Sequence, residues 1–415
     1  MQQQRHVAIK CVRQQELNAL GKREASILRH INDHDVDGAS LESICYDISV
    51  ALSVVRLLET FEEKGHFCLV LELLVTPILN VERWGPWRRA PGSTRAPHQS
   101  QPFLKQKTTD IGVWSSKEQG RNQTNRRDAV LCAPPLSLVE VWQVEVHLCV
   151  ALAFLHDKGL IHADVKPENV VRSGGETPVG TSFSSPPCSS LVKLVDFGNC
   201  WDVNELAAYA DENGPRGFDV QTVTYRAPEV GAGLLLCSAM DMWSLGCLLL
   251  ECMSGEPLFT LTALVASGRE QTQVKTSEND HLLEQIERVV TNGISLDATC
   301  ALYQSAALYK ERKAVENRNA SMGKKRELST PLQELLHLVA PVDRHFHDFI
   351  FRLLDVNPAT RATAKSALFH PFLQAYFPFV MVFAQSNVQT TSRDHEENVA
   401  VVPSVAIANT KRNAL

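Results

Sequence analysis

Residues 161–170 read Ile161-His162-Ala163-Asp164-Val165-Lys166-Pro167-Glu168-Asn169-Val170. Within this stretch, Asp164 offers a carboxylate that can orient a hydroxyl group and accept its proton. Lys166 offers a cation for the same reacting group, and Asn169 offers a neutral oxygen suited to a hard ion such as Mg²⁺. The transfer of a phosphoryl group requires a carboxylate, a cation and a metal ligand of this kind. The stretch therefore predicts a phosphoryl-transfer site.

Two further segments supply complementary groups. Val195-Asp196-Phe197-Gly198 follows a short predicted strand, and a carboxylate at a strand end beside a flexible glycine can bind Mg²⁺ between phosphates. Val7-Ala8-Ile9-Lys10 predicts a strand, and the helix predicted at 22–30 carries Glu24. A lysine held by a helix glutamate can place a cation at the α and β phosphates of a nucleotide. Glu16 is an alternative partner for this lysine.

Together with two later segments, these motifs resemble those of the eukaryotic protein kinase domain. The later segments are Thr222-Val223-Thr224-Tyr225-Arg226-Ala227-Pro228-Glu229 and Asp241-Met242-Trp243-Ser244-Leu245-Gly246. The resemblance runs from Val7 to Phe372, apart from two insertions. It implies an α+β, bilobal protein-kinase-like fold with a small β-rich N-lobe and a larger, mainly helical C-lobe.

The resemblance also assigns supporting roles. It implies that Glu229 forms a buried ion pair with Arg361, and that Asp241 holds the backbone of the 161–170 loop. Thr222 would link the substrate-binding segment to the same loop. These roles exclude the small-molecule phosphotransferases that share only the shorter motifs.

The implied activity is that of a protein serine/threonine kinase that uses ATP and Mg²⁺. Lys166 after Asp164 resembles the serine/threonine type of loop, and the protein hydroxyl would attack ATP directly, without a covalent enzyme intermediate. The competing interpretation is a pseudokinase, a scaffold that keeps the fold without turnover. The residues implied for the nucleotide and the metal are Ala8 and Val171 at the adenine, Glu72 to Leu74 at the hinge, Lys10 at the phosphates, and Asn169 and Asp196 at Mg²⁺.

Within the kinases, several segments resemble the CMGC group. Residues 54–61 and 66–74 are apolar runs separated by Glu62-Glu63-Lys64-Gly65, so they predict two strands of a β-hairpin. Both runs look like dual-specificity tyrosine-regulated and homeodomain-interacting kinases. Residues 196–201 and 219–222 look more like SR-protein kinases, and residues 278–295 resemble the start of the CMGC insert.

Two departures from the family pattern concern regulation and specificity. Ala163 replaces the arginine that commonly binds a phosphate on the activation segment, and Asp219 stands where tyrosine-regulated relatives carry an activating tyrosine. Without that cation, activity is expected not to require activation-segment phosphorylation. Val223 replaces an arginine usual in the CMGC group, so the sequence does not predict a proline-directed preference.

A third departure is that no G-x-G-x-x-G motif precedes Val7. In kinases this glycine-rich hairpin covers the ATP phosphates with backbone N–H groups. Two explanations are open: an incomplete N-terminus of the sequence, or a chain without this roof and with weak or no activity.

The chain divides into a truncated N-lobe and hinge at 1–74, an early C-lobe region at 75–135, a C-lobe at 136–376 and a disordered tail at 385–415. A flexible insertion at about 82–133 carries ten Lys and Arg against four Asp and Glu. It is either a solvated loop, a docking or nuclear-targeting segment, or sequence that does not belong in the mature protein. Further insertions are predicted at 173–190 and, as the CMGC insert, at about 262–330.

Composition limits the function classes. The 415 residues carry a formal net charge of -6, which gives no whole-chain case for nucleic-acid binding. The eleven scattered cysteines indicate reduced thiols in an intracellular protein of the nucleus, the cytoplasm or both. The apolar runs at 245–252 and 377–384 are too short to cross a membrane.

Overall fold

The structure is a computed structural model that describes residues 6–32, 53–79, 136–173, 191–213, 220–234, 236–260, 277–319 and 332–374. Several predictions lie outside these residues. They concern the basic insertion at 82–133, Asp219, nearly all of the insertion at 173–190 and the tail at 385–415.

The N-lobe contains a three-stranded antiparallel sheet with the strand order β1-β3-β2. The strands are β1 (Val7–Cys11), β2 (Leu57–Glu63) and β3 (His66–Glu72). β2 and β3 form the predicted hairpin, and Lys64 and Gly65 make its turn with φ of 52° and 80°. β2 begins three residues later than the prediction at 54–61, because Val54 instead bridges to Leu194 of the C-lobe.

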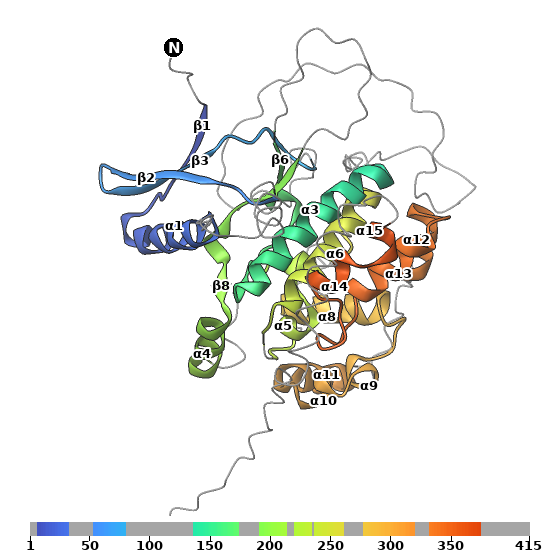
Figure 1. Ribbon diagram of the computed structural model, residues 1–415. Helices are drawn as coiled ribbons and strands as arrows, with labels where there is room; N and C mark the ends of the chain where they lie inside the picture. The colour runs from blue at the N-terminus through green and yellow to red at the C-terminus, as the bar shows by residue number, and fades with distance from the viewer. Residues whose placement is uncertain are drawn as a thin grey trace, which may run out of the picture.

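Helix α1 (Asn18–Asn32) packs on this sheet (Figure 1). Ala25, Leu28 and Ile31 recur at helical spacing and are buried, so one apolar face of the helix covers the strands. Glu24 is also buried. The helix extends beyond the predicted range of 22–30 at both ends. It carries the Glu24 carboxylate on its buried face.

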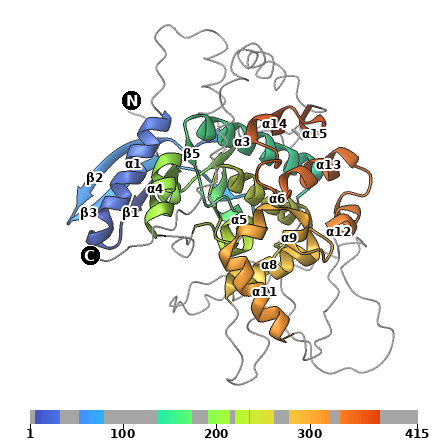
Figure 2. The same cartoon turned by 90° about the horizontal axis from the view of Figure 1, so that it is seen from below.

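The C-lobe is built around helix α3 (Leu138–Asp157), and α6 (Ala239–Ser254) packs against it (Figures 1 and 2). Ser137 caps α3: its Oγ accepts a hydrogen bond from Glu140 N, and its N donates to Glu140 Oε2 at 2.9 Å. Among the described residues, α3 is the one helix long and apolar enough to cross a membrane. Because 78% of its most apolar window is buried inside the protein, it has the surroundings of a core helix.

Short strands and further helices complete the C-lobe. The strands form one sheet in the order β4-β6-β7 and one pair, β5-β8. They are β4 (Thr76–Pro77), β5 (Leu160–Ile161), β6 (Val170–Arg172), β7 (Val192–Leu194) and β8 (Trp201–Asp202). The helices are α4 (Val203–Asn213), α5 (Pro228–Gly231), α8 (Glu278–Val289), α9 (Leu296–Thr299), α10 (Leu302–Ser305), α11 (Ala307–Asn319), α12 (Leu332–Val339), α13 (Arg344–Leu353), α14 (Ala364–Leu368) and α15 (Pro371–Gln374).

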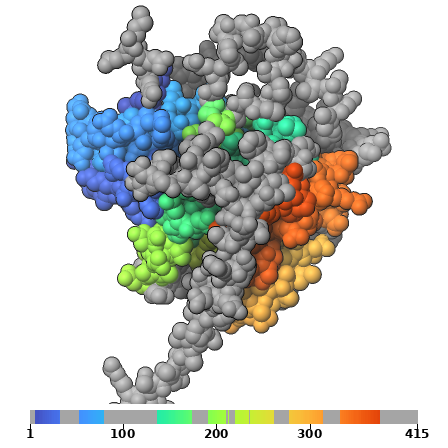
Figure 3. All heavy atoms as spheres, viewed as in Figure 1, coloured from blue at the N-terminus to red at the C-terminus, as the bar shows by residue number. Residues whose placement is uncertain are grey.

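The two lobes meet along β7. Val55 N donates to Leu194 O at 3.0 Å, and Lys193 Nζ lies 2.6 Å from Glu72 Oε1. In the space-filling view the blue N-lobe adjoins the green start of the C-lobe (Figure 3). The predicted α+β, bilobal fold is confirmed.

Candidate functional site

Two carboxylates from separate segments, Glu24 and Asp196, meet at Lys10. Lys10 Nζ lies 2.7 Å from Glu24 Oε1 and 2.8 Å from Glu24 Oε2. It also lies 2.6 Å from Asp196 Oδ1. Of the two predicted partners of Lys10, Glu24 is therefore the one that the structure pairs with it. The alternative, Glu16, is exposed in the short 3-10 turn before α1.

Both charges of the Lys10–Asp196 contact are stabilised by their surroundings. Burial alone would lower the pKa of Lys10, but Glu24 and Asp196 raise it above its usual value. Burial alone would raise the pKa of Asp196, but the charge and hydrogen bond of Lys10 lower it. Asp196 has a left-handed backbone with φ of 65°, which is uncommon for a residue other than glycine. The site thus presents a fixed cation beside an ionised carboxylate.

The Asp164 carboxylate accepts hydrogen bonds on both oxygens. Oδ1 accepts from Thr222 Oγ1 at 2.7 Å, and Oδ2 accepts from Lys166 Nζ at 2.7 Å. Lys166 Nζ also donates to Thr222 Oγ1 at 2.9 Å. Oδ2 further accepts from Asn169 Nδ2 and Asn199 Nδ2, each at 3.2 Å. The structure therefore brings together the predicted residues Asp164, Lys166, Asn169 and Thr222.

Asn199 was not predicted as a site residue. It stands directly after Phe197-Gly198, within residues 196–201, which resemble SR-protein kinases. A 3-10 turn at Phe197–Asn199 directs its side chain to Asp164. A polar residue one position beyond the Asp-Phe-Gly motif is the only sequence signal that could have indicated it.

The network keeps Asp164 ionised. Burial would raise the pKa of this carboxyl, but Lys166 and Thr222 lower it below its usual value. A carboxylate with a lowered pKa is a weak base, so it is better suited to orient a hydroxyl group than to remove its proton early.

The buried Asp241 holds the backbone around Asp164. Asp241 Oδ2 accepts from His162 N and Oδ1 accepts from Ala163 N, both at 2.9 Å. Ala163 has a left-handed backbone with φ of 61°, which costs conformational energy in an alanine. The His162 ring bonds to Val195 O at 3.1 Å and so connects this loop to the strand end before Asp196.

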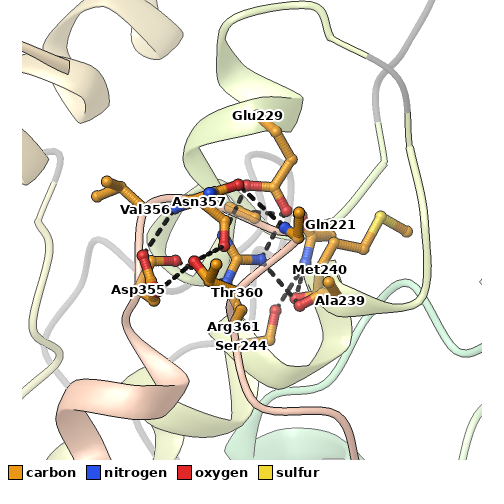
Figure 4. Close-up of polar contacts among 12 residues, drawn as sticks. Gln221, Glu229, Ala239, Met240, Ser244, Asp355, Val356, Asn357, Thr360 and Arg361 are labelled. Carbon is orange, nitrogen blue, oxygen red and sulfur yellow. Dashed lines mark hydrogen bonds and ion pairs between the residues drawn. The ribbon is translucent and has the colours of Figure 1, made fainter. Parts of the chain in front are cut away.

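The C-lobe also contains a buried ion pair between Glu229 and Arg361 (Figure 4). Arg361 donates to Glu229 through both guanidinium nitrogens, at 2.6 and 2.8 Å, and both side chains are fully buried. Arg361 also donates to Ala239 O at the start of α6 and to Asp355 O after α13. The pair anchors α5 to the end of the C-lobe, and this contact agrees with the role implied by the family resemblance.

The residues predicted at the adenine lie on three elements. Ala8 is half-buried on β1, Val171 is half-buried on β6, and Leu74 is half-buried in the segment that follows β3. Val75 N donates to Arg172 O at 2.9 Å, which places this segment beside β6. The Glu72 carboxylate already pairs with Lys193, so a contact from this residue to adenine would use its backbone.

Asn169 and Asp196 fit a hard cation. Asn169 donates through Nδ2 to Asp164 O and Asp164 Oδ2, and its amide oxygen accepts no hydrogen bond from the described residues. The Asp196 side chain is 42% exposed, so one face is open to a ligand. No cluster of three or more His, Cys, Asp or Glu exists among the residues that the structure describes. A site with few protein ligands suits Mg²⁺, which keeps waters and phosphate oxygens in its shell.

Comparison with known proteins agrees with this geometry. The family model described as "Protein kinase domain" matches residues 134–373, more than half of the chain. The chain is 31% identical over 227 residues to "Dual specificity tyrosine-phosphorylation-regulated kinase 2" of Drosophila melanogaster, covering 54% of this chain and 26% of that protein. It is 30% identical over 258 residues to "Serine/threonine-protein kinase AFC3" of Arabidopsis thaliana, covering 58% of each.

The similarity to "Dual specificity protein kinase CLK1" of Homo sapiens extends over the N-lobe. That match is 25% identical over 375 residues and covers 89% of this chain and 60% of the relative. The chain thus spans between about a quarter and three fifths of the length of these curated relatives. With the bilobal fold and the kinase motifs in place, the chain belongs to the protein kinase domain family and, within it, to the CMGC group.

Proposed function

We propose that this chain is a protein serine/threonine kinase that transfers the γ-phosphoryl group of ATP to a protein hydroxyl. One observation carries the proposal: the Asp164 carboxylate is held by Thr222 and Lys166 while Lys10 is held by Glu24 and Asp196. The family in general uses ATP and Mg²⁺.

Each residue has a separate role in the proposed transfer. Asp164 orients the attacking hydroxyl, and Lys166 neutralises charge on the phosphoryl group that moves. Lys10 binds the α and β phosphates, with Glu24 fixing its position. Asn169 and Asp196 would hold Mg²⁺, which when bound neutralises the charge of the nucleotide phosphates.

The adenine would lie between the lobes. Ala8 on β1 and Val171 on β6 offer apolar contacts, and the backbone from Glu72 to Leu74 offers hydrogen bonds to the adenine edge. This assignment rests on the family resemblance and on the placement of the residues.

We also infer that activity does not need a phosphate on the activation segment. Arg23 on α1 donates to Cys200 O at 2.6 Å and to Glu205 at 2.7 Å, and its guanidinium lies 4.9 Å from the Trp201 ring. These contacts tie the helix that carries Glu24 to the segment after Asp196 without any phosphate. Ala163 cannot bind a phosphate. Together with the Arg23 contacts, it supports a site that is active without phosphorylation of the activation segment.

The test is phosphate transfer by the 415-residue protein from labelled ATP with Mg²⁺ to a generic basic protein substrate. We expect transfer, and we expect it to fall at least a thousandfold in Asp164→Asn while ATP binding persists. Nucleotide binding without transfer by the unaltered protein would contradict the proposal and indicate a scaffold. Transfer that persists in Asp164→Asn would point to a contaminating kinase.

Two further statements about this chain stay predictions. The basic segment at 82–133 lies outside the described residues, so its docking or nuclear-targeting role stays a prediction. The intracellular location expected from the cysteine pattern also stays a prediction. The protein-kinase family implies a protein substrate.

A further inference from the structure

Two cysteines face each other across the N-lobe sheet. Cys11 ends β1, and Cys68 lies opposite it on β3 in the antiparallel register. Their Sγ atoms are 3.1 Å apart, and both thiols are free. The two residues are 57 positions apart in the chain, so the tertiary fold alone brings them together.

The register places the two cysteines directly opposite each other on neighbouring strands, a position compatible with a disulfide. Val12 N donates to Phe67 O at 2.9 Å directly after β1, so a backbone hydrogen bond joins the positions next to the two cysteines. The neighbouring pair, Cys11 and Cys68, is then a non-hydrogen-bonded pair, for which the Cα atoms are about 4.5 Å apart and the side chains are closest. This separation lies within the range of about 4.4–6.8 Å seen in disulfides.

The two thiols differ in access. Cys11 is exposed, whereas Cys68 is only 1% exposed. Cys68 Sγ is the donor of the hydrogen bond between the two sulfurs and also lies 3.6 Å from His66 O. The hydrogen bond to Cys11, followed by burial, raises the pKa of Cys68. Cys11 is therefore the sulfur that meets a soluble reagent first, and Cys68 is placed to react second.

We propose that Cys11 and Cys68 form a redox modification site, in which a peroxide converts the pair reversibly to a disulfide. The Cys11 thiolate attacks one peroxide oxygen, the O–O bond breaks, and the leaving hydroxide takes up a proton to become water. Cys68 then loses its proton and attacks the resulting sulfenic sulfur, which forms the S–S bond and expels the oxygen as a second water. The thiols lose two electrons and two protons, and the peroxide gains them.

The link would tether β1, an edge strand of the described sheet, to the central strand β3. β1 carries Lys10, the residue before Cys11, so the disulfide would hold the strand that places the phosphate-binding cation. In a reducing compartment such a bond is transient and responds to oxidants. The site does not depend on the proposed kinase activity.

The buried cysteines among the described residues are less suited to this chemistry. Burial raises the pKa of Cys200 to about 12, and Cys149 and Cys252 are fully buried with pKa values raised well above normal. A buried thiol with a raised pKa supplies little thiolate for attack. We therefore expect peroxide to oxidise Cys11 in preference to these buried cysteines.

The experiment exposes the full 415-residue protein to hydrogen peroxide and maps its thiols by mass spectrometry of a non-reducing digest. We expect a cross-linked peptide pair containing Cys11 and Cys68 that disappears on addition of dithiothreitol. The oxidised protein should also unfold at a temperature a few degrees higher than the reduced protein, because the link restricts the unfolded chain. Cys11→Ser, an exposed change, should abolish both effects, whereas Cys300→Ser at another solvent-accessible cysteine should retain them.

Three results would overturn the proposal. Cys11 could be recovered as sulfinic acid without a cross-link, or joined to another cysteine or to a second chain. Alternatively, Cys11→Ser could show the same thermal shift as the unaltered protein. Cys68→Ala provides an independent check, since it must also lose the cross-linked peptide pair.

Discussion

At Asp164 a single carboxylate accepts hydrogen bonds from a hydroxyl, an ammonium and two amides. These donors fix the direction of both oxygens and lower the pKa of the group, so the carboxylate is preorganised before any substrate arrives. A loose phosphoryl-transfer transition state needs orientation more than strong base catalysis. The arrangement at this residue matches that need.

Asn199 is the least expected of these donors, and it is open to a direct test. We expect Asn199→Ala to lower kcat by roughly tenfold with little change in KM for ATP, because a hydrogen bond to a charged group is worth about 1.5–3 kcal/mol. The loss of a donor should also raise the pKa of Asp164, which moves the acid limb of the kcat–pH profile to higher pH. Steady-state kinetics over a pH series measure both effects.

The matched control is Asn204→Ala, an exposed asparagine near the start of α4. It should leave kcat and the pH profile unchanged. A change in KM for ATP alone in Asn199→Ala, with the pH profile unmoved, would contradict a positioning role for this residue.

At the scale of elements, α1 is held against the segment after Asp196 through Arg23. We expect Arg23→Gln to reduce the activity of phosphatase-treated protein by roughly tenfold, because Glu24 on the same helix then positions Lys10 less firmly. Initial rates with and without phosphatase treatment measure this effect. Lys22→Gln, on the same helix, removes an exposed ion pair with Glu62 of β2 and serves as the control.

Phosphatase treatment itself separates two explanations of the result. If the unaltered protein loses its activity on treatment, phosphorylation rather than the Arg23 contacts assembles the site. If Arg23→Gln and Lys22→Gln behave alike, the contacts of Arg23 have no positioning role.

Helix α3 contains a half-buried histidine, His147, whose titration should affect the free energy of unfolding. Burial, followed by the charge of Lys193, lowers the pKa of His147 from 6.5 to about 4. Its Nδ1 lies 3.2 Å from Ser53 Oγ. Because the folded state disfavours the protonated ring, the full contribution is present above pH 6.5 and is lost as the pH falls toward 4.

We therefore expect His147 to account for a fall of about 3 kcal/mol in the free energy of unfolding as the pH is lowered from neutral to 4. Urea unfolding at a series of pH values should show a smaller fall in His147→Gln than in the unaltered protein. His345→Gln on α13 changes an exposed ring and should reproduce the unaltered profile. If the free energy of unfolding falls equally with pH in the unaltered protein and in His147→Gln, the fold does not lower the pKa of this ring.

At the scale of the whole molecule, the Glu229–Arg361 pair joins segments that are 132 residues apart (Figure 4). Removing one partner of a buried ion pair leaves an uncompensated charge, which costs about 3–5 kcal/mol. We expect Arg361→Met to lower the free energy of unfolding by about this amount in urea titrations. Arg352→Met, which breaks an exposed pair with Asp348 on α13, should cost less than about 1 kcal/mol.

A similar loss of free energy of unfolding in both variants would show that the buried pair stabilises the fold no more than the exposed pair does. If Arg361→Met instead lowers activity at unchanged stability, the pair acts on the substrate-binding segment near Thr222 rather than on the fold. Unfolding and transfer measured on the same preparations distinguish the two cases.

The sequence was informative where function depends on close spacing along the chain. Asp164, Lys166 and Asn169 lie within one loop, so the loop conformation brings them together once Asp241 holds its backbone. The bilobal fold was likewise predictable, because the order of the motifs along the chain resembles the protein kinase domain and that resemblance implies two lobes. The start of β2 was predicted too early, because Val54 pairs with Leu194 rather than extending the hairpin.

The sequence alone thus determined the kinase motifs, the two lobes and the residues of the catalytic loop, since each depends on local order. Tertiary structure decided the choice of Glu24 over Glu16, the approach of Asn199 to Asp164, the Arg23 contacts and the Cys11–Cys68 pair. Lys10 and Asp196 are 186 residues apart in the chain yet 2.6 Å apart in space. Contacts of this kind depend on how sheet, helix and loop pack together, and no spacing along the sequence encodes that packing.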